Sequence, residues 1–456
     1  MTQTAQVVIC GAGSVGVATA YYLAAHHQIR DVLLVDLHPP LSQTSAKSGE
    51  NIRAWWPVQP MVDLANRSFD LMEALAAETG NAFHLEKRGY AYATQDAAGL
   101  QGYLDHYRSL ARLGEIRIHD RGATGAGYAA PWESQPSDGL DGADVLLDPV
   151  LIRQTFPHFA PTVQAVVHAR RAGSISAQGL GMLLLERAKA AGVRELRGEV
   201  VAVETKGGAV CGVTVHTPAG PQHIETRNFV NAAGPFANRV AALLGRSLPI
   251  STVFQQKIAF QDTLGVIPRN APFTIFMDRQ RIAWSDEERQ EFASDPAYAW
   301  LLEELPGGLH IKPEGGPEST WIKLGWAINQ RGEEPIWERP GDPAFPDLVL
   351  RGAATLAPGL RQYVGRLPRP LLHYGGYYTK TPENLPLIGP LGVDGAFIAG
   401  AFSGFGTMMS CAGGELAAAW VAGAELPSYA EVFSLNRYTN PTLVETLSRL
   451  ARAGEL

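Results

Sequence analysis

The sequence predicts an α/β fold with a second, β-rich domain. One observation is a glycine turn between an apolar run and a helical pattern at the start of the chain, and another is a second glycine-rich turn at 400–406. Between the two turns lie segments dominated by β-branched and aromatic residues. Such residues favour strands, and three of these segments, 89–94, 252–262 and 320–329, predict a sheet that covers the first domain.

The first glycine turn has the sequence pattern of a dinucleotide site. Gly11 permits a tight turn, Gly13 lets the backbone approach a pyrophosphate, and Gly16 lets the following helix pack closely on the strand. A second apolar run ends in Asp36, 20 residues past Gly16. Its carboxylate would accept hydrogen bonds from a ribose and disfavour a 2′-phosphate. This βαβ unit predicts a Rossmann-type domain with phosphates at the helix N-terminus. The turn consists of Gly11, Ala12, Gly13, Ser14, Val15 and Gly16.

A polar loop at 42–49 follows this unit and continues the predicted site. Its hydroxyls and backbone amides could line phosphates. The residues we assign to it are Ser45, Lys47 and Ser48.

Composition excludes several classes of function. The chain has 456 residues, 46% of them hydrophobic, and a net charge of −7 without a basic stripe. We therefore expect no nucleic-acid partner and a soluble protein with more than one domain. No apolar stretch is long enough for a membrane-spanning helix, and the first residues lack a signal-peptide pattern, so we expect a cytoplasmic location. Three separated cysteines predict neither disulfides nor a metal site.

The pattern of elements predicts that the nucleotide-binding domain is discontinuous. A helix at 177–191, strands at 199–203 and 229–234, and the second glycine turn all belong to it. The Gly- and Pro-rich stretch 306–319 predicts a surface loop. The predicted division is 1–85, 148–245 and 366–440 for the nucleotide-binding domain, 86–147 and 246–365 for the substrate domain, and 441–456 for a C-terminal tail.

Four ordered motifs give the chain a family resemblance. They are Gly11 to Gly16, Asn231-Ala232-Ala233-Gly234-Pro235, the stretch Tyr378-Thr379-Lys380-Thr381-Pro382-Glu383-Asn384-Leu385-Pro386-Leu387-Ile388-Gly389, and Gly400-Ala401-Phe402-Ser403-Gly404-Phe405-Gly406. Over nearly its whole length the chain resembles the D-amino-acid-oxidase-like superfamily of FAD-dependent amine oxidoreductases, which includes sarcosine oxidases, glycine oxidases and dimethylglycine dehydrogenases. This resemblance implies a glutathione-reductase-like FAD-binding domain and oxidation of a C–N bond.

The second glycine turn supports this assignment on physical grounds. It opens a predicted helix whose positive end could face an anion, such as the pyrimidine edge of a reduced flavin. That contact would stabilise the reduced form and favour removal of a hydride from a substrate. The residues we expect to bind FAD are Gly11, Gly13, Ser14, Val15, Gly16, Asp36, Ser45, Lys47, Ser48, Val200, Ala233, Gly234, Gly400, Ser403, Gly404, Phe405, Gly406, Thr407 and Met408.

The resemblance to sarcosine oxidases also implies catalytic candidates. Lys323 matches a strand lysine that lies over the flavin and promotes dioxygen reduction, and alternation turns it away from Ile322 and Leu324. Tyr378 matches a tyrosine near the substrate, and Arg53 matches an arginine that could bind a carboxylate. The alternatives are a solvent-facing lysine, a packed aromatic ring, and an arginine that merely pairs with a neighbouring carboxylate.

Departures from the sarcosine oxidases modify the expected site. Gly376 stands where those enzymes carry the cysteine that is linked to the flavin, which excludes covalent attachment there and favours noncovalent FAD. Met408, Phe405 and Ala327 replace a lysine and two histidines, which disfavours small carboxylates as substrates. We predict a wider, apolar pocket, although each tryptophan could instead be core packing. The pocket residues are Trp55, Trp56, Trp326 and Phe405, beside Arg53 and Met408.

The expected reaction is oxidation of an amine or N-alkyl amino acid to an imine, with dioxygen reduced to hydrogen peroxide. No side chain is identified as a general base. The alternatives are a dehydrogenase subunit that passes electrons to a quinone or protein, a non-catalytic flavoprotein assembly factor, and an NAD-linked dehydrogenase. The oligomeric state stays open.

Overall fold

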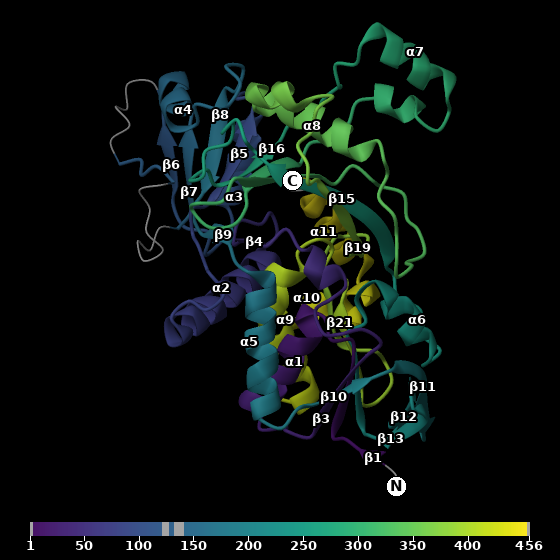
Figure 1. Cartoon of the computed structure of the whole chain (residues 1–456). Helices are drawn as coiled ribbons and strands as arrows, with labels where there is room; N and C mark the ends of the chain where they lie inside the picture. Colours follow the sequence, from purple (N-terminus) through teal and green to yellow (C-terminus); the bar gives the residue numbers. More distant parts are fainter. Residues whose placement is uncertain (1–2, 121–126, 132–140, 454–456) are drawn as a thin grey trace.

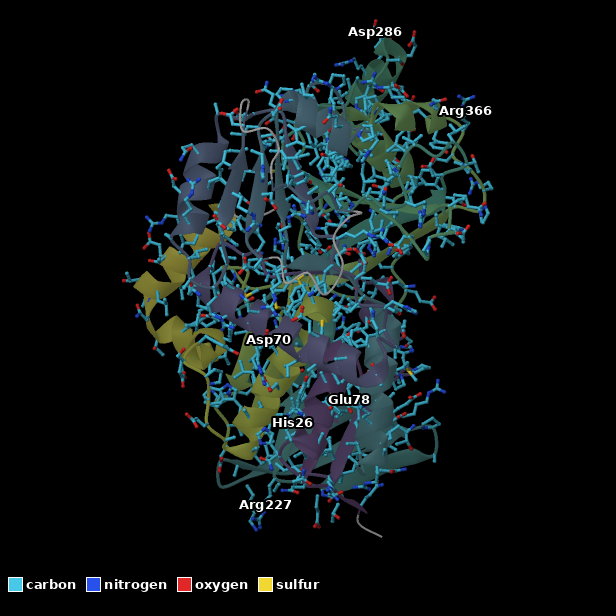
Figure 2. All side chains as sticks on the ribbon, turned by 90° about the vertical axis from the view of Figure 1, so that its left-hand side faces the viewer. His26, Asp70, Glu78, Arg227, Asp286 and Arg366 are labelled. Carbon is cyan, nitrogen blue, oxygen red and sulfur yellow. The ribbon has the colours of Figure 1, made fainter. Side chains whose placement is uncertain are left out.

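A computed structural model describes residues 3–120, 127–131 and 141–453, so the predicted segment 86–147 and the predicted tail lie partly outside the described residues. The molecule has two lobes, each built around a large sheet (Figure 1). Asp286 and Arg366 lie at the end of the molecule opposite Arg227 (Figure 2). None of the described helices has the length and hydropathy to span a bilayer.

The first lobe is organised by a mainly parallel sheet, called the parallel sheet below. The pairing confirms the βαβ unit, because β2 lies between β3 and β14 with parallel register. Only β20 pairs antiparallel within the described part of this sheet. Its strands, in spatial order, are β10 (Arg194–Arg197), β3 (Val32–Asp36), β2 (Val7–Cys10), β14 (Asn228–Asn231), β21 (Ala396–Gly400) and β20 (Leu387–Pro390).

Helices bury both the sheet and one another in this lobe. Helix α1 (Ser14–Ala25) follows β2 and is apolar on nearly all sides, which suits a helix enclosed by other elements. Helix α9 (Gly406–Ala422) crosses it so closely that a Cβ at Gly414 would lie 2.6 Å from the Cβ of Ala18. The other elements of this lobe are α5 (Ala177–Ala190), α6 (Ala237–Ala242), α10 (Ala430–Phe433), α11 (Pro441–Ala453), β1 (Gln3–Thr4), β11 (Glu199–Lys206), β12 (Ala209–Thr217) and β13 (Gly220–Glu225).

The second lobe is organised by a mixed sheet. Strand β17 lies inside this sheet, so the prediction of a surface loop at 306–319 was wrong: residues 309–313 pair with β16 and β18. Among the described residues, the strands in spatial order are β19 (Leu372–Lys380), β15 (Ser251–Gln261), β18 (Trp321–Trp326), β17 (Leu309–Pro313), β16 (Phe273–Phe276), β5 (Tyr90–Thr94), β8 (Ala165–Ala169), β7 (Ala143–Leu146) and β6 (Ile116–His119).

The two faces of the mixed sheet differ in character. One face packs Ile322, Leu324 and Trp326 against α8 (Phe345–Leu356) in an apolar core.

The strands β8 and β19 belong to this sheet, although the predicted boundaries group their residues with the nucleotide-binding segments. The division into domains stays a prediction. The remaining helices of this lobe are α3 (Leu100–Arg108), α4 (Pro149–Thr155) and α7 (Asp286–Ser294).

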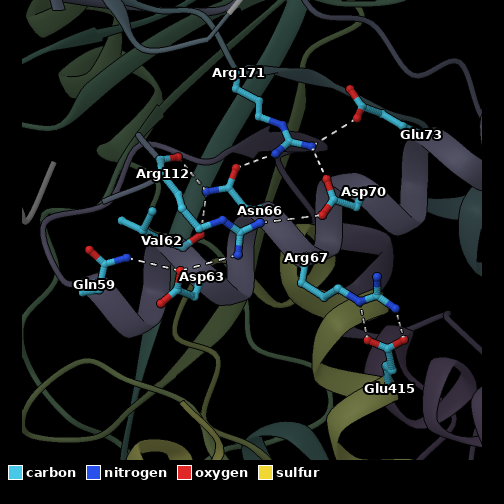
Figure 3. Close-up of polar contacts among 10 residues, drawn as sticks. All are labelled: Gln59, Val62, Asp63, Asn66, Arg67, Asp70, Glu73, Arg112, Arg171 and Glu415. Atoms are coloured by element: carbon cyan, nitrogen blue, oxygen red, sulfur yellow. Dashed lines mark hydrogen bonds and ion pairs between the residues drawn. The ribbon is translucent and has the colours of Figure 1, made fainter. Parts of the chain in front are cut away.

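Helix α2 (Gln59–Thr79) ties the two lobes together. The Arg67 guanidinium donates to both oxygens of Glu415 on α9, at 2.7 and 2.5 Å. On the same helix, Asn66 and Asp70 accept from Arg171, at 2.5 and 2.6 Å (Figure 3). Arg171 lies between β8 and β9 (Ala172–Ser174), and β9 pairs with β4 (Asn51–Arg53). These contacts hold residues 51–58 at the junction of the lobes.

Candidate active site

Close packing requires glycine at two positions of the first glycine turn. Gly11 has φ +114°, and a Cβ there would lie 2.2 Å from the carbonyl oxygen of Ala232. A Cβ at Gly16 would lie 1.9 Å from the carbonyl oxygen of Gly11. Larger residues at either position would push α1 away from the strand ends, so the turn keeps the start of α1 at the edge of the parallel sheet.

Asp36 organises the turn from the neighbouring strand. Its carboxylate accepts hydrogen bonds from the backbone N–H of Ala12 at 2.7 Å and of His38 at 2.9 Å. Burial, together with the nearby charges of Asp36 and Glu199, raises the pKa of the Cys10 thiol to about 12. Cys10 therefore stays a neutral thiol beside the turn.

The polar loop lies directly over the start of α1. Ser45 belongs to the short 3-10 helix Thr44–Lys47, and its hydroxyl accepts a hydrogen bond from the backbone N–H of Ser14 at 3.0 Å. A Cβ at Gly376 would lie 3.3 Å from the Cβ of Lys47, which brings this loop against β19. The Ser48 hydroxyl accepts the backbone N–H of Glu50 at 2.9 Å and so shapes the end of the loop.

A cavity of about 830 Å³ joins these features. It extends from the end of β3 across the first glycine turn to β19, and it is bounded by the polar loop. An elongated space with glycine turns, a carboxylate for a ribose and a helix N-terminus suits a dinucleotide such as FAD. The predicted cofactor residues that line it are Gly11, Gly13, Asp36, Ser45, Lys47, Val200, Ala233 and Gly234.

The second glycine turn packs on β19 rather than on this cavity wall. A Cβ at Gly404 would lie 2.3 Å from the Tyr378 ring, and the Ser403 N–H donates to the Thr379 carbonyl at 2.8 Å. Ser403 has φ +49°, and α9 begins just after the turn, at Gly406. Burial raises the pKa of Tyr378 to about 12, so its hydroxyl stays neutral. The rest of this predicted set, Gly400, Phe405, Thr407 and Met408, lies at the end of β21 and the start of α9.

Lys323 lies on the face of the mixed sheet opposite the α8 core, as alternation predicts. Its Nζ is 2.6 Å from Glu314 Oε1, and Lys312 Nζ is 3.3 Å from the same oxygen. Lys312 also donates to the Gly49 carbonyl at 3.3 Å, which brings this group to the end of the polar loop. Burial disfavours the charge of Lys323, but Glu314, Tyr374 and Glu50 together outweigh burial, and the pKa of Lys323 is raised. The lysine is therefore held as a cation.

The charged neighbours of Lys323 were not among the residues that the sequence indicated. Glu314 and Lys312 fall in the stretch that we predicted as a loop. Lys257, on β15, faces the same side, with its Nζ 5.8 Å from the centre of the Tyr378 ring. Burial and the charge of Lys323 lower the pKa of Lys257 to about 8. A lysine inside the predicted strand 252–262 was the available signal.

Arg53 lies in an aromatic enclosure next to β5. Its Nη1 donates to the Tyr92 hydroxyl at 2.6 Å, and its guanidinium lies 4.4 Å from the centre of the Trp56 ring. Trp56 makes an edge contact with Phe405, with 4.8 Å between ring centres. Trp55 instead stacks on Tyr107 within the core, with 4.4 Å between ring centres.

Trp326 requires a correction, because it does not lie with the other predicted pocket residues. It shares a face with Ile322 and Leu324, is fully buried in the core against α8, and donates its Nε1–H to the Pro306 carbonyl at 2.9 Å. The period of two along β18 separates it from Lys323.

Comparisons with known proteins show the family and the fold of this chain. The sequence model described as FAD dependent oxidoreductase (DAO) matches residues 6–420. L-proline dehydrogenase from P. horikoshii has a similar structure, with TM-score 0.71 and 20% identity over 97% of this chain and 99% of its own. Glycine oxidase from Geobacillus kaustophilus has TM-score 0.69 and 20% identity over 96% of this chain and 99% of its own. Iminodiacetate oxidase from Chelativorans sp. BNC1 has TM-score 0.67 and 17% identity over 94% of this chain and 98% of its own. No curated protein sequence matches the chain.

Proposed function

The chain belongs to the FAD-dependent oxidoreductase family, and on that premise we propose that it oxidises the C–N bond of an amine or N-alkyl amino acid to an imine, with dioxygen as electron acceptor. The substrate loses two electrons and two protons, and dioxygen takes them up as hydrogen peroxide. The imine is then hydrolysed by water. The observation that carries this proposal is the buried Lys323–Glu314 pair, whose Nζ–Oε1 distance is 2.6 Å.

The cofactor of this family is FAD, and the cavity residues would hold it without a covalent bond. The turn at Gly11–Gly13 and the Ser45 hydroxyl would face the pyrophosphate, and Asp36 would face a ribose. Gly376 offers no thiol for attachment. When bound, FAD supplies the two-electron redox chemistry, taking a hydride equivalent from the carbon next to nitrogen and passing the electrons on.

Lys323 would supply the positive charge that dioxygen reduction requires. It is only 6% exposed, and Glu314 fixes its position, so little reorganisation is needed when negative charge develops nearby. A fixed charge in a water-poor site stabilises a developing anion far more than the same charge in water. Glu314 therefore acts as a positioning residue, and Lys323 is the proposed catalytic residue.

The substrate side is proposed from Arg53, Tyr378 and their aromatic neighbours. Arg53 would pair with a substrate carboxylate, and Trp56 and Phe405 would form an apolar wall wide enough for a bulky amine. The names of three similar solved structures specify proline, glycine and iminodiacetate, which supports a C–N donor. Delivery of the unprotonated amine needs no dedicated base, and we assign none.

The decisive experiment mixes the purified yellow protein, without air, with a panel of primary, secondary and N-methylated amines and amino acids. Loss of flavin absorbance at roughly 450 nm identifies the substrate class, and readmission of air tests the acceptor. We expect bulky secondary amines or amino acids to bleach the flavin and air to restore it with release of peroxide. Turnover of glycine and sarcosine alone would reject the wide pocket.

Other outcomes point to the alternative functions. Bleaching that air does not reverse would favour a dehydrogenase that uses a quinone or a protein acceptor. Absence of bleaching with every compound would favour a partner-dependent subunit or a non-catalytic flavoprotein, and gel filtration with a candidate partner would separate these two.

A further inference from the structure

The connection between β18 and α8 covers the cofactor cavity. Its central part, residues 333–341 and called the strap below, contributes cavity-lining residues from Ile336 to Gly341. The strap belongs to the second lobe by sequence, but it lies against the first lobe: Arg239 of α6 donates to the Pro335 carbonyl at 2.8 Å.

The first part of the strap is anchored to the mixed sheet. The Glu333 N–H donates to the Thr252 carbonyl at 2.9 Å, and the Thr252 hydroxyl donates back to the Glu333 carbonyl. The Ile336 N–H donates to the Tyr377 hydroxyl at 3.1 Å. These bonds fix residues 333–336 along the edge of the mixed sheet and direct the next residue, Trp337, toward the parallel sheet.

Trp337 spans the first glycine turn. Its ring centre lies 4.5 Å from that of His38 and 4.0 Å from that of Phe236. His38 follows β3 and Phe236 follows β14, and these two strands flank β2 in the parallel sheet. A side chain that touches both therefore lies across the end of β2, where the Gly11–Gly13 turn begins.

The apolar surface of the strap is incompletely covered by the protein. Trp337 is 43% exposed and Ile336 is 49% exposed, although both line the cavity. Exposed aromatic surface on the wall of a cavity gains free energy when a ligand buries it. His38 is two residues past Asp36, so the part of a dinucleotide nearest to Trp337 is its adenosine half.

We propose that the strap is a clamp for noncovalent FAD, in which Trp337 packs on the adenosine diphosphate half of the cofactor. The clamp goes beyond the proposed amine oxidation, because it depends on FAD binding alone. It gives the cofactor a second wall, supplied by a different lobe, where no covalent link holds it. FAD can then leave only when the strap contacts at Tyr377 and Arg239 open.

The test measures FAD release from the holoenzyme after dilution into FAD-free buffer, followed by the fluorescence of free FAD. Loss of an aromatic contact of this kind weakens binding about tenfold. We therefore expect Trp337→Ala to release FAD about tenfold faster than the wild type. Trp337→Phe should restore slow release. Trp300→Ala, which removes a tryptophan that packs on the α8 core, serves as the matched control and should match the wild type.

Release at the wild-type rate from a folded Trp337→Ala protein would overturn the clamp. If that variant does not fold, a glutamate-specific protease acting on the wild-type protein decides. The strap contains Glu338, which is exposed and is followed by Arg339. Excess FAD should slow cleavage after Glu338 relative to FAD-stripped protein, and equal cleavage would reject the proposal.

Discussion

Lys323 and Glu314 form a buried ion pair across neighbouring elements of the mixed sheet, with 2.6 Å between Nζ and Oε1. Lys312 shares the same carboxylate oxygen, whereas Lys257 faces the same side from β15. One carboxylate thus holds two of the lysines on this face, and positive charge remains in excess beside the Gly49 end of the polar loop. The charge of this face is the feature that distinguishes the proposed oxidase from a simple FAD-binding protein.

Removing the Lys323 charge should separate the two half-reactions. We expect Lys323→Met to slow reoxidation of the reduced flavin by dioxygen by about 10²-fold, comparable to loss of one preorganised transition-state contact, while anaerobic reduction changes little. Stopped-flow absorbance measures both rates. Lys206→Met, at an exposed position on β11, is the control. Equal losses in both half-reactions would contradict the role in dioxygen reduction.

Lys257 should make stability depend on pH. Its pKa is lowered from 10.5 to about 8 by burial and by Lys323, whereas the unfolded chain keeps an ordinary lysine. Below pH 8 both states are protonated and the buried charge destabilises the fold. Between pH 8 and 10.5 the unfolded state binds more protons, so stability rises, by about 1 kcal/mol per pH unit at most.

The measurement for Lys257 compares thermal unfolding of the wild type and Lys257→Met at saturating FAD from pH 7 to 10. The wild type should gain stability relative to the variant as pH rises through about 8. In Lys323→Met the pH at which Lys257 titrates should be higher, because the charge of Lys323 no longer repels the protonated Lys257. Parallel pH profiles for wild type and Lys257→Met would show that Lys257 does not titrate in this range.

The second glycine turn provides a matched pair of substitutions. A Cβ at Gly404 would meet the Tyr378 ring at 2.3 Å, whereas one at Gly406 would meet the Cβ of Phe402 at 3.5 Å, an ordinary contact. We expect Gly404→Ala to displace Tyr378, lower the melting temperature and raise KM at least several-fold. Gly406→Ala should leave both close to the wild type. Similar effects of the two substitutions would show that the Tyr378 contact is not what requires glycine.

The two tryptophan environments predict opposite phenotypes. Trp326 fills the core against α8, so Trp326→Ala should cost about 3–5 kcal/mol of stability while leaving the ranking of substrates unchanged. Trp56 lies against Arg53 and Phe405, so Trp56→Phe should alter substrate preference at a smaller cost in stability. Urea unfolding and a substrate panel measure the two properties. If a folded Trp326→Ala protein ranked the substrates differently from the wild type, Trp326 would be assigned to the substrate pocket.

The effect of an Arg53 substitution on KM should depend on whether the substrate carries a carboxylate. If it binds a carboxylate, Arg53→Gln should raise KM for amino acids by roughly 10- to 100-fold, equivalent to a charged hydrogen-bonded contact. For amines without a carboxylate the same substitution should change KM little. Steady-state assays on an amino acid and its decarboxylated analogue separate the two cases, and equal effects on both would assign Arg53 to structure.

Local patterns in the sequence were enough for much of the fold. The predicted helix 177–191 corresponds to α5, Ala177–Ala190, and the predicted strands 89–94, 252–262 and 320–329 overlap β5, β15 and β18. The alternation that oriented Lys323 also places Trp326 with Ile322, so the error on Trp326 was avoidable from the sequence. Strand β17 was hidden because glycines and prolines surround it, although one of its partners, β18, is the next strand in the sequence.

The sequence by itself determined the nucleotide-binding turn, the acid at the end of β3 and the family, because each of these depends on residues a few positions apart whose spacing sets their geometry. Only the tertiary structure decided which carboxylate holds Lys323, which face carries Lys257, and that Trp337 crosses the Gly11 turn from the other lobe. Those relationships join residues that strand pairing and lobe packing bring together, and long-range pairing has no local signature in the chain.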